Sequence, residues 1–576
     1  MNSEKRTCQN CKNEFTIEPD DFGFYEKIGV LPPKLCPACR AQLRLSFRNE
    51  RVFYKRACDK CKKDVVSMYS PNKLYTVWCY DCWFSDDWDA GEYAREYDPS
   101  KPFFEQLGNL LDSVPRVALV HVRSVNSEYL NISADNKNCY MIVESSNNED
   151  CTHCYWIQKC KDCVDVSFAH ETELSYESDD CYSCYKIFWS KGCHDSRESY
   201  FLLNSRNCSD CIGCVNLRSK QYHIFNKPYS KEEYEKMKGE LKLHTRSGIK
   251  EFKEKFEKFV RTQPIKYAEI YNSVDSTGNY IKNAKHCVSC FHCYDSEDCK
   301  YGVHTWRNAK DCVDCDTAGR NAELIYNSIN AGIDTARHIS SNLCWTCTEM
   351  DYSHYCFNSN FCFGCAGLRK KNYCILNKQY EKEEFLKLRE EIISNMKKEG
   401  IYGDFFPSGM SAFGYNESAA QDQFPLTKEE AERWGFKWED HPRGTYKKET
   451  VFWNQVSDSI RETELDVLKE IFVCTECEKN FRIIPGEYDF YKRMDIPLPD
   501  LCPDCRHIRR FTARGPNKLF SRSCQCGGKK SENGTYENIA EHEHGGGKCG
   551  NAFQTNFSPE KDEIIYCEEC YQSEII

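Results

Sequence analysis

Residues 138–165 read NCYMIVESSNNEDCTHCYWIQKCKDCVD, and this stretch decides the fold of the centre of the chain. Cys139, Cys151 and Cys163 lie twelve residues apart, separated by short aromatic or β-branched segments with many Asn, Asp and Ser residues. Such segments are typical of strands and turns, and they lack the 3.6-residue period of a helix. A parallel β-solenoid explains the rhythm, because stacked cysteines fill its interior as small apolar side chains while Asn or Asp marks each corner.

The same pattern occurs twice in the chain. The pentapeptide KDCVD at 161–165 returns at 310–314, and the motif CxxCxxLRxK at 211–220 returns at 362–371. The spacing between equivalent residues stays between 149 and 151, which indicates a duplication. We therefore predict a multidomain, mainly β protein whose centre is a duplicated, right-handed, Cys/Asn-rich β-solenoid with short helices after each repeat. The predicted boundaries are 124–228 for solenoid repeat A, 229–264 for a helical segment, 265–379 for solenoid repeat B and 380–400 for a helix.

Both ends of the chain carry cysteines in closely spaced pairs, four pairs at each end. A tight turn between two cysteines aims both sulfurs at one point, which suits tetrahedral Zn²⁺. We predict treble-clef or zinc-ribbon-like double zinc modules over 1–95 and 471–576, a connector at 96–123, a linker with a short helix at 401–470, and about four zinc ions per chain. The predicted ligands are Cys8, Cys11, Cys36, Cys39, Cys58, Cys61, Cys79, Cys82, Cys474, Cys477, Cys502, Cys505, Cys524, Cys526, Cys567 and Cys570.

The sequence leaves the pairing of these cysteines open. The pairs of one module can combine in sequential order or can interleave, since the spacers accommodate either arrangement. The C-terminal copy also contains an insertion with His542, His544, a glycine run and Cys549. We interpret this insertion as a flexible surface loop rather than as a source of further ligands.

Forty cysteines in 576 residues are an extreme count. No apolar segment follows the first residues, so we expect no secretory signal, and apolar runs such as 117–120 are too short to span a membrane. A cytoplasmic location follows as an expectation, and in a reducing compartment thiols serve metal binding or chemistry rather than disulfides. For the cysteines between 139 and 374 we favour packing inside a solenoid, with zinc knuckles or an iron–sulfur cluster as alternatives.

A basic segment follows the CPxCR motif of each module, although the chain as a whole carries a formal charge of −11. Arg and Lys neutralise phosphates and interleaved aromatic rings stack on bases, so these segments are candidates for binding RNA or another nucleic acid. The alternative is a solvated face, or a docking surface for the acidic centre of the same chain. The candidate nucleic-acid residues are Arg40, Arg44, Arg48, Arg51, Lys55, Arg56, Arg506, Arg509, Arg510, Arg514, Lys518 and Arg522.

The sequence contains no GxSxG motif, no HExxH motif and no glycine-rich phosphate loop. We therefore expect a non-enzymatic, zinc-binding scaffold or adaptor, with RNA or another nucleic acid as its candidate partner and no membrane association. One alternative function is protein–protein assembly through the central solenoid. Another is a metal or redox enzyme that uses an iron–sulfur cluster or a reactive thiol.

Several longer motifs carry a resemblance, among them WCYDCWFSDDWD at 78–89, GCVNLRSKQYHIFNK at 213–227 and FPLTKEEAERWG at 424–435. With them the chain resembles a group of uncharacterised, cysteine-rich multi-zinc-ribbon proteins of environmental bacterial genomes, over nearly its whole length. The resemblance implies zinc-ribbon modules and no established activity; such sequences sometimes bear an acyl-CoA transferase label, which no residue here supports. The chain departs from the pattern at the CxC of Cys524 and Cys526 and at the loop around Cys549, both in the fourth metal site.

Overall fold

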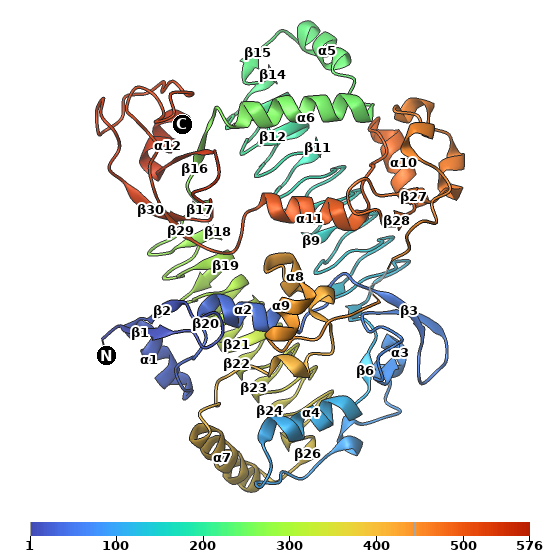
Figure 1. Cartoon of the computed structure of the whole chain (residues 1–576), viewed down its shortest axis with the longest axis vertical. Helices are drawn as coiled ribbons and strands as arrows, with labels where there is room; N and C mark the ends of the chain where they lie inside the picture. The colour runs from blue at the N-terminus through green and yellow to red at the C-terminus, as the bar shows by residue number, and fades with distance from the viewer. Residues whose placement is uncertain (1, 442–443, 576) are drawn as a thin grey trace.

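The structure is a computed structural model that describes residues 2–441 and 444–575. Two stacks of short parallel strands form its centre, and helices and the two terminal modules surround them (Figure 1). The stacks lie side by side and run in opposite directions. Glu144 of repeat A contacts Thr317 of repeat B, whereas Tyr182, further along repeat A, contacts Tyr294, which comes earlier in repeat B. The prediction of a mainly β fold built on a β-solenoid is confirmed.

Each coil of repeat A takes twelve residues. Parallel pairing joins residues twelve apart, such as Tyr155 with Ser167 and Arg197 with Ser209. Every third residue over 123–225 has a left-handed backbone with φ between 44° and 65°, so one coil has four corners. Asn, Asp and Gly adopt this conformation at the lowest cost, which explains why they precede so many of the central cysteines.

From Leu130 to Cys214, the residue after each corner is buried in the interior of the solenoid. The thiol of Cys151 donates to main-chain carbonyls, with its Sγ 3.3 Å from Glu149 O and 3.5 Å from Cys160 O. Burial raises the pKa of Cys151 well above the ordinary thiol value, so this thiol stays protonated. Every cysteine from Cys139 to Cys374 is a buried free thiol, as packing inside a solenoid predicts. One cluster of such interior positions consists of Leu130, Cys139, Ile142, Cys151, Cys154, Ile157, Cys160, Cys163, Val166 and Ala169.

Most strands of both repeats are short, although β20 (Val303–Ala318) has 16 residues, and the strands follow one another along the stack. Those of repeat A are β7 (His121–Val122), β8 (Ser133–Ala134), β9 (Tyr155–Gln158), β10 (Ser167–His170), β11 (Tyr185–Phe188), β12 (Arg197–Leu203), β13 (Ser209–Val215), β14 (Gln221–Ile224) and β15 (Lys227–Pro228). Before them, β6 (Arg116–Val117) pairs with β5 (Val77–Trp78) of the N-terminal module. Those of repeat B are β17 (Ile270–Tyr271), β18 (Gly278–Lys282), β19 (Cys290–Glu297), β20 (Val303–Ala318), β21 (Glu323–Ala331), β22 (Ala336–Ile339), β23 (Thr348–Asp351), β24 (Asn360–Phe363), β25 (Asn372–Ile375) and β26 (Lys378–Gln379). In each repeat the last strand turns back in antiparallel pairing, which ends the stack.

The helices that precede each repeat in sequence pack on the other repeat. Helix α4 (Phe103–Ser113) comes before repeat A, yet Phe103 packs its ring against Tyr352 and Phe363 of repeat B. Helix α6 (Arg246–Val260) comes before repeat B, yet Phe252 packs against Phe201 of repeat A. Helices α5 (Lys231–Glu240) and α7 (Lys382–Lys398) follow the two repeats, as predicted.

Two equivalent glycines make this helix packing possible. Gly213 and Gly364 have φ of +65° and +62°, and a Cβ at either position would lie 2.8 Å from Cζ of Phe252 or Phe103. A side chain larger than hydrogen would therefore meet the ring and strain the backbone at once. The cross-packing of α4 and α6 consequently has the same structural requirement in both repeats.

The two terminal modules share one order of elements: hairpin, two helices, second hairpin, strand and final helix. The N-terminal module consists of β1 (Glu4–Thr7), β2 (Glu14–Ile17), α1 (Pro19–Ile28), α2 (Pro37–Leu45), β3 (Tyr54–Ala57), β4 (Asp64–Ser67), β5 (Val77–Trp78) and α3 (Tyr80–Phe84). The C-terminal module consists of β27 (Phe472–Val473), β28 (Asn480–Phe481), α10 (Pro485–Met494), α11 (Pro503–Ala513), β29 (Phe520–Ser523), β30 (Ala552–Thr555), β31 (Ile564–Tyr566) and α12 (Glu568–Ile575).

The segment predicted as a linker packs against the rest of the molecule. Phe405 and Phe406 contact the ring of Phe47, and the short helices α8 (Ala419–Gln423) and α9 (Lys428–Arg433) follow. Thr427 caps α9 together with Glu430, as its capping-box sequence predicts. Across the two described stretches, no helix combines the length and apolar character needed to cross a membrane.

Candidate metal centres and the cleft between the solenoids

The structure brings the terminal cysteines together in groups of four. Within each group all sulfur atoms lie within 4.8 Å of one another. The first pair of a module combines with its second pair, and the third with the fourth, so the sequential arrangement is the one observed. Three groups follow the predicted ligands fully: Cys8, Cys11, Cys36 and Cys39; Cys58, Cys61, Cys79 and Cys82; Cys474, Cys477, Cys502 and Cys505.

Each of these groups is built from a tight turn and a helix N-terminus. In the first group, the Lys12 N–H donates to Cys8 O and Lys12 has a φ of +63°, which turns the chain sharply directly after Cys11. Cys36 is the N-cap of α2, with Pro37 at the first helical position, and its N–H donates to Cys8 Sγ at 3.3 Å. Sulfur anions are stabilised at such a helix N-terminus by its exposed N–H groups.

The sulfur spacing fits a tetrahedral metal ion. A four-coordinate ion with metal–sulfur bonds of about 2.3 Å separates neighbouring sulfurs by about 3.8 Å. Neighbouring sulfurs lie 3.8 Å apart in the first and second groups and 3.7 Å apart in the third. A hydrogen bond with Cys39 lowers the pKa of Cys36 to about 5, so one thiol of the first group ionises readily. These groups are therefore positioned to hold a metal ion.

The fourth group differs from the prediction. It consists of Cys524, Cys549, Cys567 and Cys570, and Cys526 instead lies in a neighbouring group with His542, His544 and Cys570. Contrary to the prediction, the insertion contributes residues to both groups: Cys549 and His542 are only 3% and 7% exposed, although most of the insertion lies on the surface. The sequence analysis assigned Cys549 to a loop and not to the ligands, because twenty-four residues separate it from Cys524 and close spacing was the signal for a ligand pair.

The structure also shows that most arginines of the basic segments are buried. Of the twelve candidate nucleic-acid residues, seven are buried: Arg40, Arg44, Arg48, Arg51, Arg506, Arg510 and Arg514. Phosphate binding requires exposed cations, so the burial of these arginines removes the observation on which the nucleic-acid prediction rested. Lys55, Arg509 and Lys518 are exposed, and Arg56 and Arg522 are partly exposed and bonded to Asp59 and Gln525.

The buried arginines form two equivalent rows that dock the modules on the solenoids. Arg40 and Arg44, one turn apart on α2, bind Asp314 and Asp316 of repeat B, with Nε–Oδ2 distances of 2.8 and 2.7 Å. In the other row, Arg506 on α11 binds Asp165 of repeat A at 3.0 Å, and Arg510 binds the same carboxylate at 3.2 Å. Asp165 and Asp314 are the last residues of the two KDCVD motifs.

Arg514 completes the second row and contacts both solenoids. Its guanidinium lies 2.6 Å from Asp179, and its Cζ lies 3.7 Å from the ring centre of Phe168 in repeat A and 4.3 Å from that of Tyr280 in repeat B. A cation between two aromatic faces is held by both ring quadrupoles. The alternative weighed from the sequence, docking on the acidic centre of the same chain, is the arrangement that the structure has.

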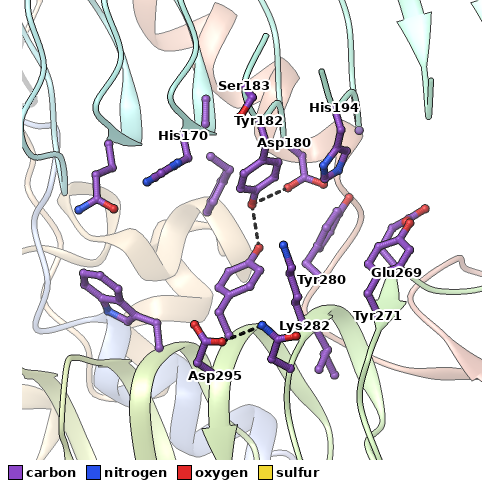
Figure 2. A pocket seen from close by; sticks show the side chains of 18 of the residues that line it. His170, Asp180, Tyr182, Ser183, His194, Glu269, Tyr271, Tyr280, Lys282 and Asp295 are labelled. Atoms are coloured by element: carbon purple, nitrogen blue, oxygen red, sulfur yellow. Dashed lines mark hydrogen bonds between the residues drawn. The ribbon is translucent and has the colours of Figure 1, made fainter. Parts of the chain in front are cut away.

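A cleft of about 490 Å³ lies between the two solenoids, a size typical of small-ligand pockets. Figure 2 shows Tyr182 and Asp180 of repeat A facing Tyr280 and Lys282 of repeat B. The hydroxyls of Tyr182 and Tyr294 lie 3.1 Å apart and join the two walls. Aromatic side chains that line the cleft are Trp156, Phe168, Tyr182, Tyr271, Tyr280, Tyr294 and Trp306.

Asp180, which lines this cleft, is expected to make stability depend on pH. Burial raises its pKa to about 7, so between about pH 4 and pH 7 the folded protein holds a proton that the unfolded chain releases, and stability falls as pH rises. Asp180→Asn should remove this loss, and its advantage over wild type should grow by about 3 kcal/mol from pH 5 to pH 8. Denaturant unfolding of both proteins at the two pH values measures this difference. A constant difference would mean that Asp180 titrates normally.

Sequence comparisons with known proteins do not identify a function for this chain. No protein-family model matches the chain, and no curated protein is significantly similar to it.

Proposed function

We propose that the protein is a non-enzymatic scaffold in which structural zinc ions stabilise two terminal modules that clamp a pair of β-solenoids. The observation that carries the proposal is the set of closed four-thiol groups, one in each half of each module. Four thiolates fill a tetrahedral zinc shell and leave no position for substrate or water, so such a site stabilises a fold rather than activating a reactant. We assign zinc-ribbon-like character to the modules on the same basis.

The docking contacts support a scaffold because the first metal group of each module is adjacent in sequence to an arginine row. Cys39 directly precedes Arg40, and Cys505 directly precedes Arg506. The ion that fixes the first turn of α2 or α11 therefore also fixes the start of the row that binds the solenoid. In this proposal the metal ions and the buried ion pairs act on the same interface.

We further propose that a partner is recognised in the cleft between the solenoids rather than along the arginine rows. The cleft offers several aromatic rings with polar groups between them, which suits a small ligand or an inserted side chain of a partner protein. RNA is disfavoured because seven of the twelve cationic side chains proposed to bind it are buried against protein. The metal or redox enzyme alternative is disfavoured by the closed thiol groups.

Metal analysis of anaerobically purified protein tests the zinc proposal. We expect at least four zinc ions per chain, a colourless solution, and the loss of one ion in Cys474→Ser. Cys163→Ser is the matched control, because Cys163 is a buried solenoid thiol outside every group able to hold a metal in the described residues. Iron with visible absorption would instead favour an iron–sulfur protein, and a metal-free folded chain would refute the proposal.

A further inference from the structure

We propose that the C-terminal module holds two metal ions that share the thiolate of Cys570, so that the chain has five metal sites and not four. This inference rests on the proposed metal binding of the four-thiol groups. Two groups in the described residues have a member in common: Cys524, Cys549, Cys567 and Cys570 form one, and Cys526, His542, His544 and Cys570 form the other. The N-terminal module has a single group at the equivalent place.

The insertion explains how the second group arises. In the N-terminal module, the Cys58 N–H donates to Lys63 O at 2.8 Å across the β3–β4 hairpin, and in the C-terminal module the Cys524 N–H donates to Asn551 O at the same distance. Cys549 therefore takes the place of Cys61, two residues before the acceptor in each case. The residues inserted between Cys524 and Cys549 are additional to the module, and they include Cys526, His542 and His544.

The distances around Cys570 fit a second tetrahedral ion. Its Sγ lies 3.4 Å from Nε2 of His544. An ion bound by one sulfur at about 2.3 Å and one nitrogen at about 2.0 Å separates these two atoms by about 3.5 Å. On the other side, Cys549 Sγ lies 3.9 Å from Cys567 Sγ, close to the edge of a four-thiolate tetrahedron. The sulfur of Cys570 is therefore placed where it can coordinate both ions.

His542 is oriented as a metal-binding histidine. Its Nε2 lies 3.0 Å from Oε1 of Glu574, while its Nδ1 is buried without a hydrogen-bond partner. A ligating imidazole characteristically donates its other N–H to a carboxylate in this way. A buried ring nitrogen left unpaired otherwise costs about 1–3 kcal/mol, and a metal ion at Nδ1 would remove that cost.

Glu574 holds the whole insertion in this position. Besides His542, its carboxylate accepts the Ile539 N–H at 2.9 Å, the Ala540 N–H at 3.2 Å and the Tyr536 hydroxyl at 3.0 Å. Asn538, in the same segment, donates its side-chain N–H to Cys526 Sγ at 3.2 Å, as expected beside a thiolate. These hydrogen bonds therefore hold the insertion around the second group.

The shared thiolate also suits the charges. Two divalent ions bound by five thiolates and two neutral imidazoles leave one excess negative charge, less than the two left by each four-thiolate ion alone. A thiolate bonded to two cations is stabilised by both, which favours Cys570 as the bridging atom over a ligand of a single ion.

Metal stoichiometry of the full chain, saturated with zinc and freed of excess ion, tests the inference. We expect five ions in wild type and four in His542→Ala/His544→Ala. The matched control is His170→Ala, which changes a cleft histidine outside every metal group and should leave five. Four ions in wild type and in the double variant would overturn the fifth site while leaving the zinc scaffold intact. Fewer than four in wild type would instead refute the scaffold proposal.

Cobalt substitution tests the shared thiolate itself. A sulfur that bridges two Co²⁺ ions couples their electron spins, so the paramagnetic resonance signal per cobalt should be lower in wild type than in the double variant. If the double variant fails to fold, Cys526→Ser can replace it in the same comparison. The cobalt ions bound by the three unchanged four-thiol groups then serve as the internal reference for the metal count. Five cobalt ions with the full uncoupled signal would show two separate sites and overturn the bridge.

Discussion

Asp165→Asn is expected to lower the free energy of unfolding by about 3 kcal/mol, because it removes the carboxylate that two buried guanidinium groups share. Arg506 keeps its second carboxylate partner, Glu487, at 3.0 Å. Arg506 and Asp165 are 1% and 0% exposed at their side chains, and Arg510 binds the same carboxylate. Asparagine keeps the size of the side chain and tolerates the left-handed backbone that Asp165 adopts, with a φ of +55°. The change therefore isolates the charge. Denaturant unfolding of the metal-loaded protein measures it.

Two further variants test this result, one as an equivalent change and one as a control. Asp314→Asn removes the equivalent carboxylate from repeat B, next to Arg40, and should have a similar effect. Asp150→Asn changes a corner aspartate with a φ of +54° outside both rows and should alter stability by less than about 0.5 kcal/mol. If all three variants unfold alike, the arginine rows contribute nothing beyond ordinary surface pairs.

Metal removal is expected to unfold both terminal modules and release them from the solenoids. Binding energies of structural zinc are about 10–16 kcal/mol in small zinc-binding domains, so most of the stability of such modules comes from the ion. After chelation under reducing conditions, amide exchange should become fast in α2 and α11 and stay slow at interior positions such as Cys151. Readdition of zinc should restore slow exchange.

The pattern of exchange distinguishes this expectation from two others. Slow exchange throughout the chelated protein would mean that the modules fold without metal. Fast exchange throughout would mean that the solenoids do not remain folded without the modules. Cys163→Ser should behave as wild type, since Ser175 and Ser199 already occupy interior positions twelve and thirty-six residues further along the same column.

Much of the solenoid could be predicted because its signal repeats. The spacing of Cys139, Cys151 and Cys163 is the length of one coil, and the residues before the cysteines mark its left-handed corners. The three-residue rhythm within a coil was not recognised, because ordinary residues such as Tyr129 and Trp156 also occupy corners. Tertiary pairing holds these residues in a conformation that their own preferences disfavour.

The sites were predictable only where their ligands are close in sequence. Paired cysteines such as Cys474 and Cys477 were identified directly, whereas Cys549 depends on a hairpin closed across an insertion. The basic segments were recognised as unusual, but their partners Asp165 and Asp314 lie far along the chain and no local signal joins them. The cleft depends on how two solenoids lie against each other, which no stretch of sequence encodes locally.

The crossed docking of the modules has a consequence during synthesis. Arg44 of α2 pairs with Asp316, which is 272 residues further along the chain. At about 5–20 residues per second, a ribosome needs roughly 15–50 seconds to make that stretch. For this time a helix with two arginines on one face has no acidic surface to bind, and it is open to chaperones and to anionic polymers. Although α2 is made early, it can dock only after repeat B has been synthesised.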